Sequence, residues 1–186
     1  MATTKHTVVA LVEDKPGVLN RVASLFRRRG FNIDSIVVGH SEVPHLSRMT
    51  ITVDGANTMV EQVRKQLDKV VNVVKVSDIT ADDLIARELA LIKVRATSST
   101  RSEIIEITDI FRANIVAVAS DSLTIEVTGD EDKINSLVSL LRGFGIRELA
   151  RTGRIAMSRG SIRSLHLGKS PAKAQDKKAK QLENLL

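Results

Sequence analysis

The sequence VEDKPGVL, residues 12–19, leads into a helical pattern that ends at Arg29 and then into GFNI, residues 30–33. An apolar, β-branched run from Thr7 to Val12 precedes it. This succession predicts a strand, a tight turn, a helix over 20–29 and a second strand. Pro16 fixes its own φ, and Gly17 lets the backbone approach a bound group closely at the start of the helix. The rest of the chain is arranged around this turn.

The turn also predicts a binding place for a small anion. The first turn of a helix carries unpaired N–H groups and the positive end of the dipole, so a carboxylate there gains roughly 0.3–1 kcal/mol from the dipole. Asn32 opens the next strand and offers a donor and an acceptor for an amino group. Together these groups indicate a site for a free amino acid. The competing interpretation is an ordinary Pro-Gly turn followed by an Asn that begins a strand.

The next segments complete one structural unit. Residues 31–38 form the second predicted strand, and residues 46–53 alternate cleanly, with Met49 on the apolar face. Apolar residues then recur at helical spacing at Val60, Val63, Leu67 and Val70. A strand over 71–76 ends the unit. The predicted order is βαββαβ.

The second half repeats this order. Residues 79–87 are polar and acidic, and the domain boundary is placed there. A strand follows at 89–96, and a capping box over 100–103, with Thr100 as its cap, opens a helix. A hairpin at 115–127, a helix stopped at Gly143, and strands at 146–150 and 155–157 complete the repeat. In such a unit both helices cover one face of a four-stranded antiparallel sheet, so we expect a neighbouring copy or a partner protein on the other face.

Composition restricts the function. The 186 residues include no cysteine, which excludes disulfides, thiolate metal sites and a cysteine nucleophile and favours a cytoplasmic location. The net charge of +6 is concentrated after residue 158, and there is no Trp or Tyr to stack nucleic-acid bases. His40 and His45 lie in a loop without a carboxylate pair, and no nucleophile–base or phosphate-binding motif occurs. We therefore predict no catalytic residue, no metal site, no nucleic-acid partner and no membrane segment.

Several segments, in this order, resemble one known family. They are EDKPGVL at 13–19, LFRRRGFNIDS at 25–35, LSRMT at 46–50, IFRA at 110–113 and SRG at 158–160. The chain is similar over about residues 5–161 to the small, regulatory subunit of acetolactate synthase, also called acetohydroxyacid synthase. The joint occurrence of these motifs is far more specific than any one of them.

The resemblance implies an α+β fold of two ferredoxin-like βαββαβ domains in tandem. The first, at 5–78, would be an ACT domain, joined by a linker at 79–87 to a carboxy-terminal domain at 88–160. The resemblance does not extend to the basic tail at 161–186, which we expect from its charge to be disordered.

The resemblance also implies a homodimer formed through the ACT domains, with valine bound between them. The residues that match the family's valine site are Asp14, Gly17, Val18, Asn32 and Ile33. The subunit would activate a separate catalytic subunit, which carries thiamine diphosphate, Mg²⁺ and FAD, and would transmit valine feedback inhibition to it. Position 14 is Asp where some members have Asn; an acid there can pair with the valine ammonium but repels its carboxylate.

Two other classes of function remain open at this point. One is an amino-acid-sensing module that controls another protein or transcription, which would require a DNA-reading helix and a salt-dependent affinity for DNA. The other is a free-standing enzyme on a ferredoxin-like fold, which would turn over pyruvate without any partner.

Overall fold

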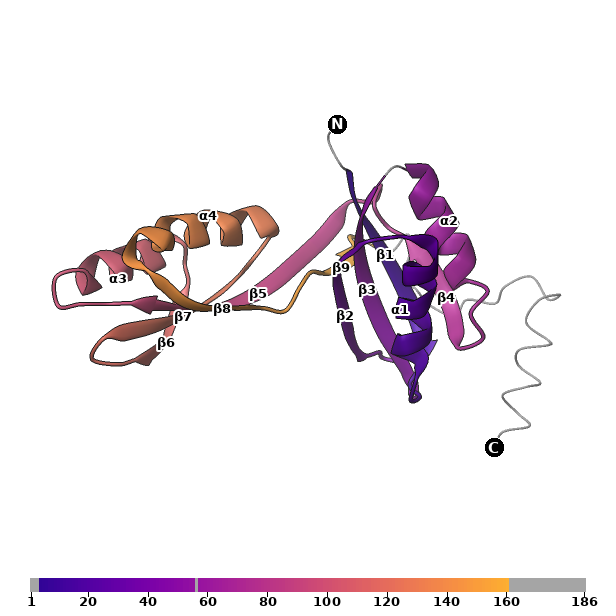
Figure 1. Ribbon diagram of the computed structural model, residues 1–186, viewed down its shortest axis with the longest axis horizontal. Helices are drawn as coiled ribbons and strands as arrows, with labels where there is room; N and C mark the ends of the chain where they lie inside the picture. The colour runs from indigo at the N-terminus through magenta and orange to yellow at the C-terminus, as the bar shows by residue number, and fades with distance from the viewer. Residues whose placement is uncertain (1–3, 56, 161–186) are drawn as a thin grey trace.

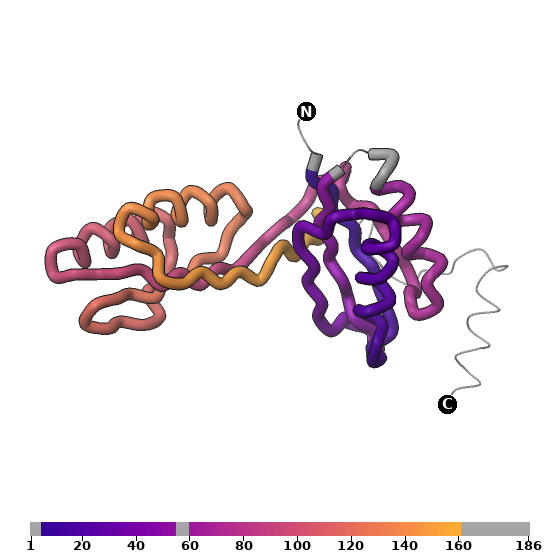
Figure 2. Tube along the Cα trace, viewed as in Figure 1, coloured from indigo at the N-terminus to yellow at the C-terminus, as the bar shows by residue number. Residues whose placement is uncertain are grey.

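The computed structural model describes residues 4–55 and 57–160 of the chain. Two lobes lie side by side and are joined by two passages of the chain (Figures 1 and 2). The first predicted unit builds the amino-terminal lobe, and the second builds the carboxy-terminal lobe. No helix within the described ranges is long and apolar enough to cross a bilayer. The basic tail lies outside the described residues.

The amino-terminal domain has the predicted βαββαβ order. Its elements are β1 (Thr4–Glu13), α1 (Val18–Arg29), β2 (Ile33–His40), β3 (Leu46–Gly55), α2 (Asn57–Leu67) and β4 (Val73–Asp78). The strands form an antiparallel sheet in the order β2-β3-β1-β4, so β2 and β4 are its edges. Helices α1 and α2 lie together on one face of this sheet (Figure 1).

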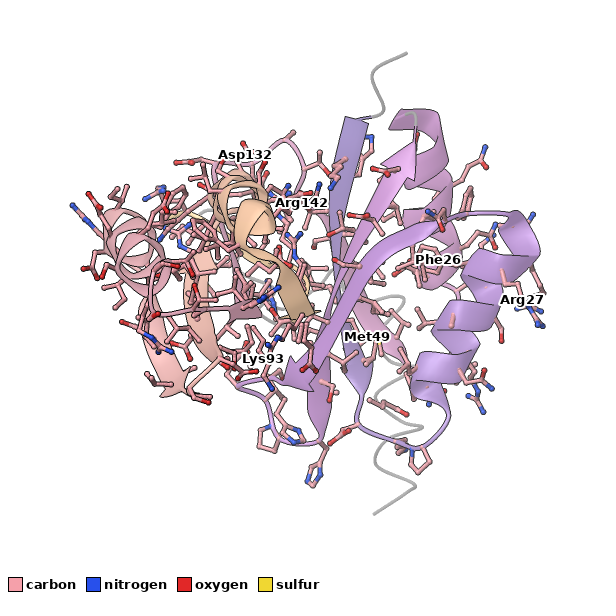
Figure 3. The ribbon with its side chains drawn as sticks, turned by 60° about the vertical axis from the view of Figure 1, so that its left-hand side comes forward. Phe26, Arg27, Met49, Lys93, Asp132 and Arg142 are labelled. Carbon is pink, nitrogen blue, oxygen red and sulfur yellow. The ribbon has the colours of Figure 1, made fainter. Side chains whose placement is uncertain are left out.

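Helix α1 packs on the sheet through the apolar stripe visible in its sequence. Val18, Val22, Leu25 and Phe26 are buried, and Phe26 meets Phe31 edge to face with ring centroids 6.3 Å apart. Figure 3 shows Phe26 and Met49, which belong to this core. Gly30 ends the helix in the left-handed conformation, with φ 68°, and donates its N–H to Arg27 O.

The carboxy-terminal domain repeats the topology. Its elements are β5 (Leu84–Arg95), α3 (Arg101–Ile110), β6 (Asn114–Val118), β7 (Ser122–Gly129), α4 (Glu131–Leu141), the 3₁₀ turn η1 (Arg142–Phe144), β8 (Ile146–Arg151) and β9 (Ile155–Ser158). Four of the strands follow the order β6-β7-β5-β8, and α3 and α4 cover one face (Figure 1). This domain has its own core, which includes Ile92, Ile125, Ile134 and Leu137.

A two-stranded ribbon connects the domains and corrects one expectation. Strand β5 begins at Leu84, and its first four residues pair with β9. Ala156 of this ribbon is buried against Val9 and Leu11 of β1, on the sheet face opposite α1 and α2. Part of the face that was expected to need a neighbouring copy or a partner is therefore covered by the chain itself.

Polar contacts anchor the ribbon to the amino-terminal domain. Arg48 of β3 donates from Nη2 to Ala156 O at 2.8 Å, and burial lowers the pKa of Arg48. Ser158 donates to Asp82 at 2.6 Å, and Arg159 pairs with Asp83 at 3.0 Å. Arg48, Ser158 and Arg159 belong to motifs on which the family resemblance rests. Of these motif residues, Arg48 joins the ribbon to the amino-terminal domain, and Ser158 and Arg159 hold the end of the ribbon to the connector before β5.

Other local predictions also need correction. The polar connector at 79–87 is strand from Leu84 onward. Thr100 is the N-cap of α3, but its side chain does not cap the helix; it accepts instead from Thr97 N at 3.0 Å. Helix α1 begins at Val18 because Gly17 already serves as its N-cap. Helix α2 ends at Leu67, so Val70 lies beyond it.

Candidate functional site

The turn before α1 leaves the start of that helix open. Gly17 is the N-cap, with φ 83°, and no side chain caps the first turn. Among the described residues, and apart from its two chain neighbours, no atom lies within 4 Å of the place where a Cβ at Gly17 would stand. An external carboxylate can therefore reach the N–H groups of the first turn, where the helix dipole favours negative charge.

Contacts to Asn72, the residue before β4, and to the loop before β3 fix this turn. Glu13 N donates to Asn72 O at 2.9 Å, and Asp14 N donates to His45 O at 2.8 Å. The Asn72 side chain donates to Glu13 Oε2 at 2.6 Å and accepts from Arg21. No local sequence pattern indicates these supporting contacts, because Asn72 is 59 residues from Glu13.

Asp14 and Val18 take different positions in the turn. The Asp14 side chain is exposed, and its Oδ2 lies 3.4 Å from His40 Nδ1 at the end of β2. The Val18 side chain is 3% exposed and belongs to the core. Val18 therefore offers a ligand only its N–H, which is 3.4 Å from Lys15 O and at the long limit of a hydrogen bond.

Asn32 and Ile33 stand at the start of β2. The Asn32 side chain is exposed and has no hydrogen-bond partner among the described residues. Ile33 is half-buried against the core and pairs with Val53 of β3. This corner of the sheet therefore offers an amide group beside an apolar side chain.

Within one chain the two groups of residues lie apart. Glu13 and His40 pair with the first residues of β3, Leu46 and Ser47, whereas Ile33 pairs with Val53 near the other end of that strand. Helix α1, of 12 residues, runs between the turn and Asn32. At 1.5 Å per residue this is a separation of roughly 18 Å. One protomer therefore does not bring Gly17 and Asn32 to a single ligand.

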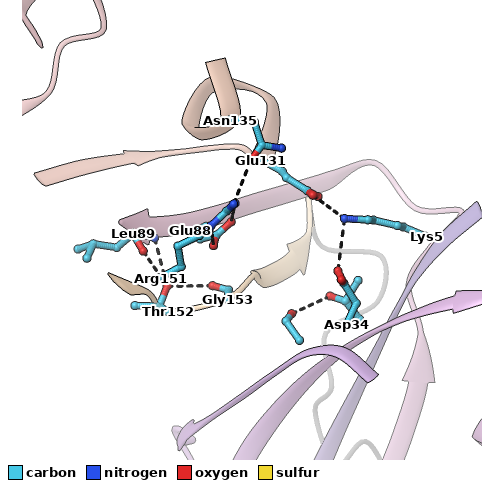
Figure 4. A network of polar contacts seen from close by, with 11 residues as sticks. Lys5, Asp34, Glu88, Leu89, Glu131, Asn135, Arg151, Thr152 and Gly153 are labelled. Carbon is cyan, nitrogen blue, oxygen red and sulfur yellow. Dashed lines mark hydrogen bonds and ion pairs between the residues drawn. The ribbon is translucent and has the colours of Figure 1, made fainter. Parts of the chain in front are cut away.

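A second polar region lies between the domains, next to the start of β2. Lys5 of β1 is 3.3 Å from Asp34 and 2.5 Å from Glu131, the first residue of α4 (Figure 4). The hydrogen bond to Glu131 raises the pKa of Lys5. Sequence reasoning did not find this region, because the Lys5–Glu131 contact spans 126 positions. In the described ranges, no three His, Asp or Glu side chains are grouped closely enough to hold a metal ion.

Family models match both domains. The model described as the AHAS small subunit-like ACT domain matches residues 9–75, and the model for the small subunit of acetolactate synthase matches residues 87–160. The two matches are separated by residues 76–86, which include the start of the ribbon that joins the lobes, and together they cover most of the described chain.

Similar proteins match along nearly their whole length. A probable acetolactate synthase small subunit of Archaeoglobus fulgidus is 59% identical over 84% of this chain and 98% of its own. The acetolactate synthase small subunit of Mycobacterium bovis is 50% identical over 86% of this chain and 95% of its own. The crystal structure of the small subunit from Thermotoga maritima superposes with a TM-score of 0.79, at 44% identity over 85% of this chain and 99% of that one. The chain therefore belongs to the family of acetolactate synthase small subunits, which are regulatory and non-catalytic.

Proposed function

We propose that this chain activates a separate catalytic subunit of acetolactate synthase and confers feedback inhibition by valine, bound between two copies of its ACT domain. The catalytic subunit would carry thiamine diphosphate, Mg²⁺ and FAD. It would convert two pyruvate molecules to acetolactate, or pyruvate and 2-oxobutanoate to acetohydroxybutanoate. Both reactions belong to the biosynthesis of branched-chain amino acids.

The observation that carries the proposal is the position of Gly17 and Asn32 at opposite ends of helix α1, which connects the central strand β1 to the edge strand β2. Strand β2 pairs only with β3 among the described strands, so its outer edge is available. A two-fold axis that pairs β2 with β2 of a second copy sets the His40 end of one strand beside the Ile33 end of the other. Gly17 of each protomer then approaches Asn32 of the other, and the dimer has two composite sites.

Each composite site has groups that match valine. The carboxylate would lie on the N–H groups of Gly17 and Val18, and the ammonium would contact Asn32 or Asp14. Ile33 would contribute apolar surface to the isopropyl group. Because two chains share each site, bound valine favours one arrangement of the two chains in the dimer over another. A ligand that distinguishes two states is what allosteric control requires.

The test is valine inhibition of the reconstituted enzyme with a Gly17→Asp chain. A carboxylate at position 17 would occupy the anion site, so the valine concentration for half-inhibition should rise at least tenfold. Gly17→Ala is the matched control, because it imposes the same left-handed φ on a residue with a Cβ without adding charge. If the Gly17→Asp and Gly17→Ala enzymes have the same valine concentration for half-inhibition, the ligand lies elsewhere.

A further inference from the structure

Lys5 links the ACT domain to the carboxy-terminal domain at one point. Its Nζ lies 3.3 Å from Asp34 Oδ2 in β2 and 2.5 Å from Glu131 Oε1 at the start of α4 (Figure 4). The three side chains are each 35–39% exposed, so solvent screens the pairs only in part. One ammonium is thus shared between carboxylates of two different domains.

The position of Asp34 ties this contact to the proposed valine site. Ile33 pairs with Val53 and Ser35 with Thr52, so Asp34 is the extra residue of a β-bulge. A bulge re-aims the side chain of its extra residue, and here the Asp34 carboxylate reaches Lys5. Asp34 follows Asn32 and Ile33 directly. A ligand that orders Asn32 and Ile33 therefore acts on the backbone that carries Asp34.

On the other side, Glu131 belongs to a firmly held helix. Asp130 caps α4 by accepting from Lys133 N at 2.9 Å. Arg151 of β8 donates one hydrogen bond to Asn135 of α4, at 2.9 Å, and another to the carboxylate of Glu88 in β5. A displacement of Glu131 is therefore coupled, through α4 and Arg151, to the sheet of the carboxy-terminal domain and is not confined to one side chain.

The space around the pair permits movement between the domains. A cavity of about 410 Å³ separates Asp34 and Thr52 on the ACT side from Glu88 and Glu131 on the other. Beside it the domains touch closely, because a Cβ at Gly153 would stand 3.2 Å from side-chain atoms of Ser35 and Val37. Asp34 and Glu131, the two partners of Lys5, both line this cavity, so the space leaves room for a change at the Lys5 contact.

We propose that Lys5 is a relay that passes occupancy of the valine site from the Asn32 end of β2 through Asp34 to Glu131 and α4. The proposal rests on the function proposed above. When valine orders the start of β2, the ion pair between Asp34 and Lys5 changes its geometry. The Lys5–Glu131 contact changes with it, because both carboxylates share one ammonium. The carboxy-terminal domain then takes the orientation that inhibits the catalytic partner.

The experiment separates valine binding from its transmission. Full-length chains carrying Lys5→Met or Glu131→Gln are titrated with valine by calorimetry and then combined with the catalytic subunit to measure activation and inhibition. Lys5→Arg retains the charge and is the conservative variant. The exposed Lys65–Glu61 pair on α2, with an N···O distance of 2.8 Å, supplies Lys65→Met and Glu61→Gln as matched controls far from the interdomain contact.

The relay predicts that valine binds Lys5→Met and Glu131→Gln with a Kd within about twofold of the unmodified chain, while maximal inhibition falls to less than half. Lys5→Arg and the α2 variants should be inhibited like the unmodified chain. Hydrogen exchange of α4 should respond to valine in the unmodified chain but not in Glu131→Gln. Full inhibition of Lys5→Met and Glu131→Gln would overturn the relay, and so would a tenfold loss of valine affinity. If the unmodified chain binds no valine, the proposed function fails first and the relay fails with it.

Discussion

Gly17 and Asn32 lie at the two ends of helix α1, roughly 18 Å apart by the rise of a 12-residue helix. This separation excludes a small amino acid that contacts both residues of one protomer. If both residues bind valine, the ligand must lie between two chains, and the dimer is part of the binding site.

Mixed dimers test this arrangement. A chain with Gly17→Asp and a chain with Asn32→Ala should each form homodimers in which both sites are damaged. In the heterodimer of the two, one composite site carries both substitutions, and the other is built from the unmodified Gly17 of one chain and the unmodified Asn32 of the other. Calorimetry on heterodimers purified with two different affinity tags should therefore recover one valine site per dimer. A site built within one chain would show no recovery.

An ion pair of the carboxy-terminal domain, which lines the cavity between the domains, also makes a prediction about stability. The carboxylate of Glu88, 8% exposed, receives Arg151 Nε at 2.6 Å and Nη2 at 2.7 Å. Arg151→Met leaves this carboxylate buried without its partner and should lower the free energy of unfolding by about 1–3 kcal/mol in urea titrations. Arg147→Met, which removes an exposed pair with Asp121, should leave it nearly unchanged.

The double variant Glu88→Gln, Arg151→Met distinguishes the loss of the ion pair from the cost of leaving the Glu88 carboxylate buried without a partner. It removes the unpaired carboxylate, so it should be more stable than Arg151→Met alone. If Arg151→Met is as stable as the unmodified chain, Glu88 gains nothing from its partner and this pair does not stabilise the carboxy-terminal domain.

The Lys5 contact predicts a specific dependence on pH. The hydrogen bond to Glu131 raises the pKa of Lys5 above its ordinary value of 10.5. A raised folded-state pKa means that this contribution is complete below pH 10.5 and is lost as the pH rises through the raised value. The stability difference between the unmodified chain and Lys5→Met should therefore be constant from about pH 7 to 9, at about 0.2–1 kcal/mol for a partly exposed pair, and should shrink in high salt. A difference that changes within this pH range would show that another group titrates at this contact.

Local sequence patterns were sufficient to predict most of the fold. The spacing of Val22, Leu25 and Phe26 defines the buried stripe of α1, and the alternation around Met49 defines the buried face of β3. Gly17 and Gly30 mark both ends of α1, because each adopts a positive φ that other residues avoid. In these places the local preference and the tertiary structure agree.

The errors occurred where distant residues decide the structure or where neighbouring groups compete for one hydrogen bond. Residues 84–87 are strand because they pair with residues 155–158, about seventy positions later, and no pattern near Asp82 and Asp83 indicates such a partner. The side chain of Thr100 serves Thr97 instead of the helix, since a nearby N–H competes for the same oxygen. Lys5 and Glu131 lie 126 positions apart and belong to different domains, so no local pattern indicates their contact.

The most direct test of the account is calorimetric titration of the full-length chain with valine, with alanine as the control ligand and Asn32→Ala as the control variant. The account predicts saturable binding of valine. Alanine lacks the two methyl groups that would contact apolar surface such as Ile33, and its binding should be weaker by about 1–3 kcal/mol for each of them. Asn32→Ala should lose most of the valine affinity. Absence of valine binding by calorimetry and by equilibrium dialysis, or undiminished binding by Asn32→Ala, would contradict the account.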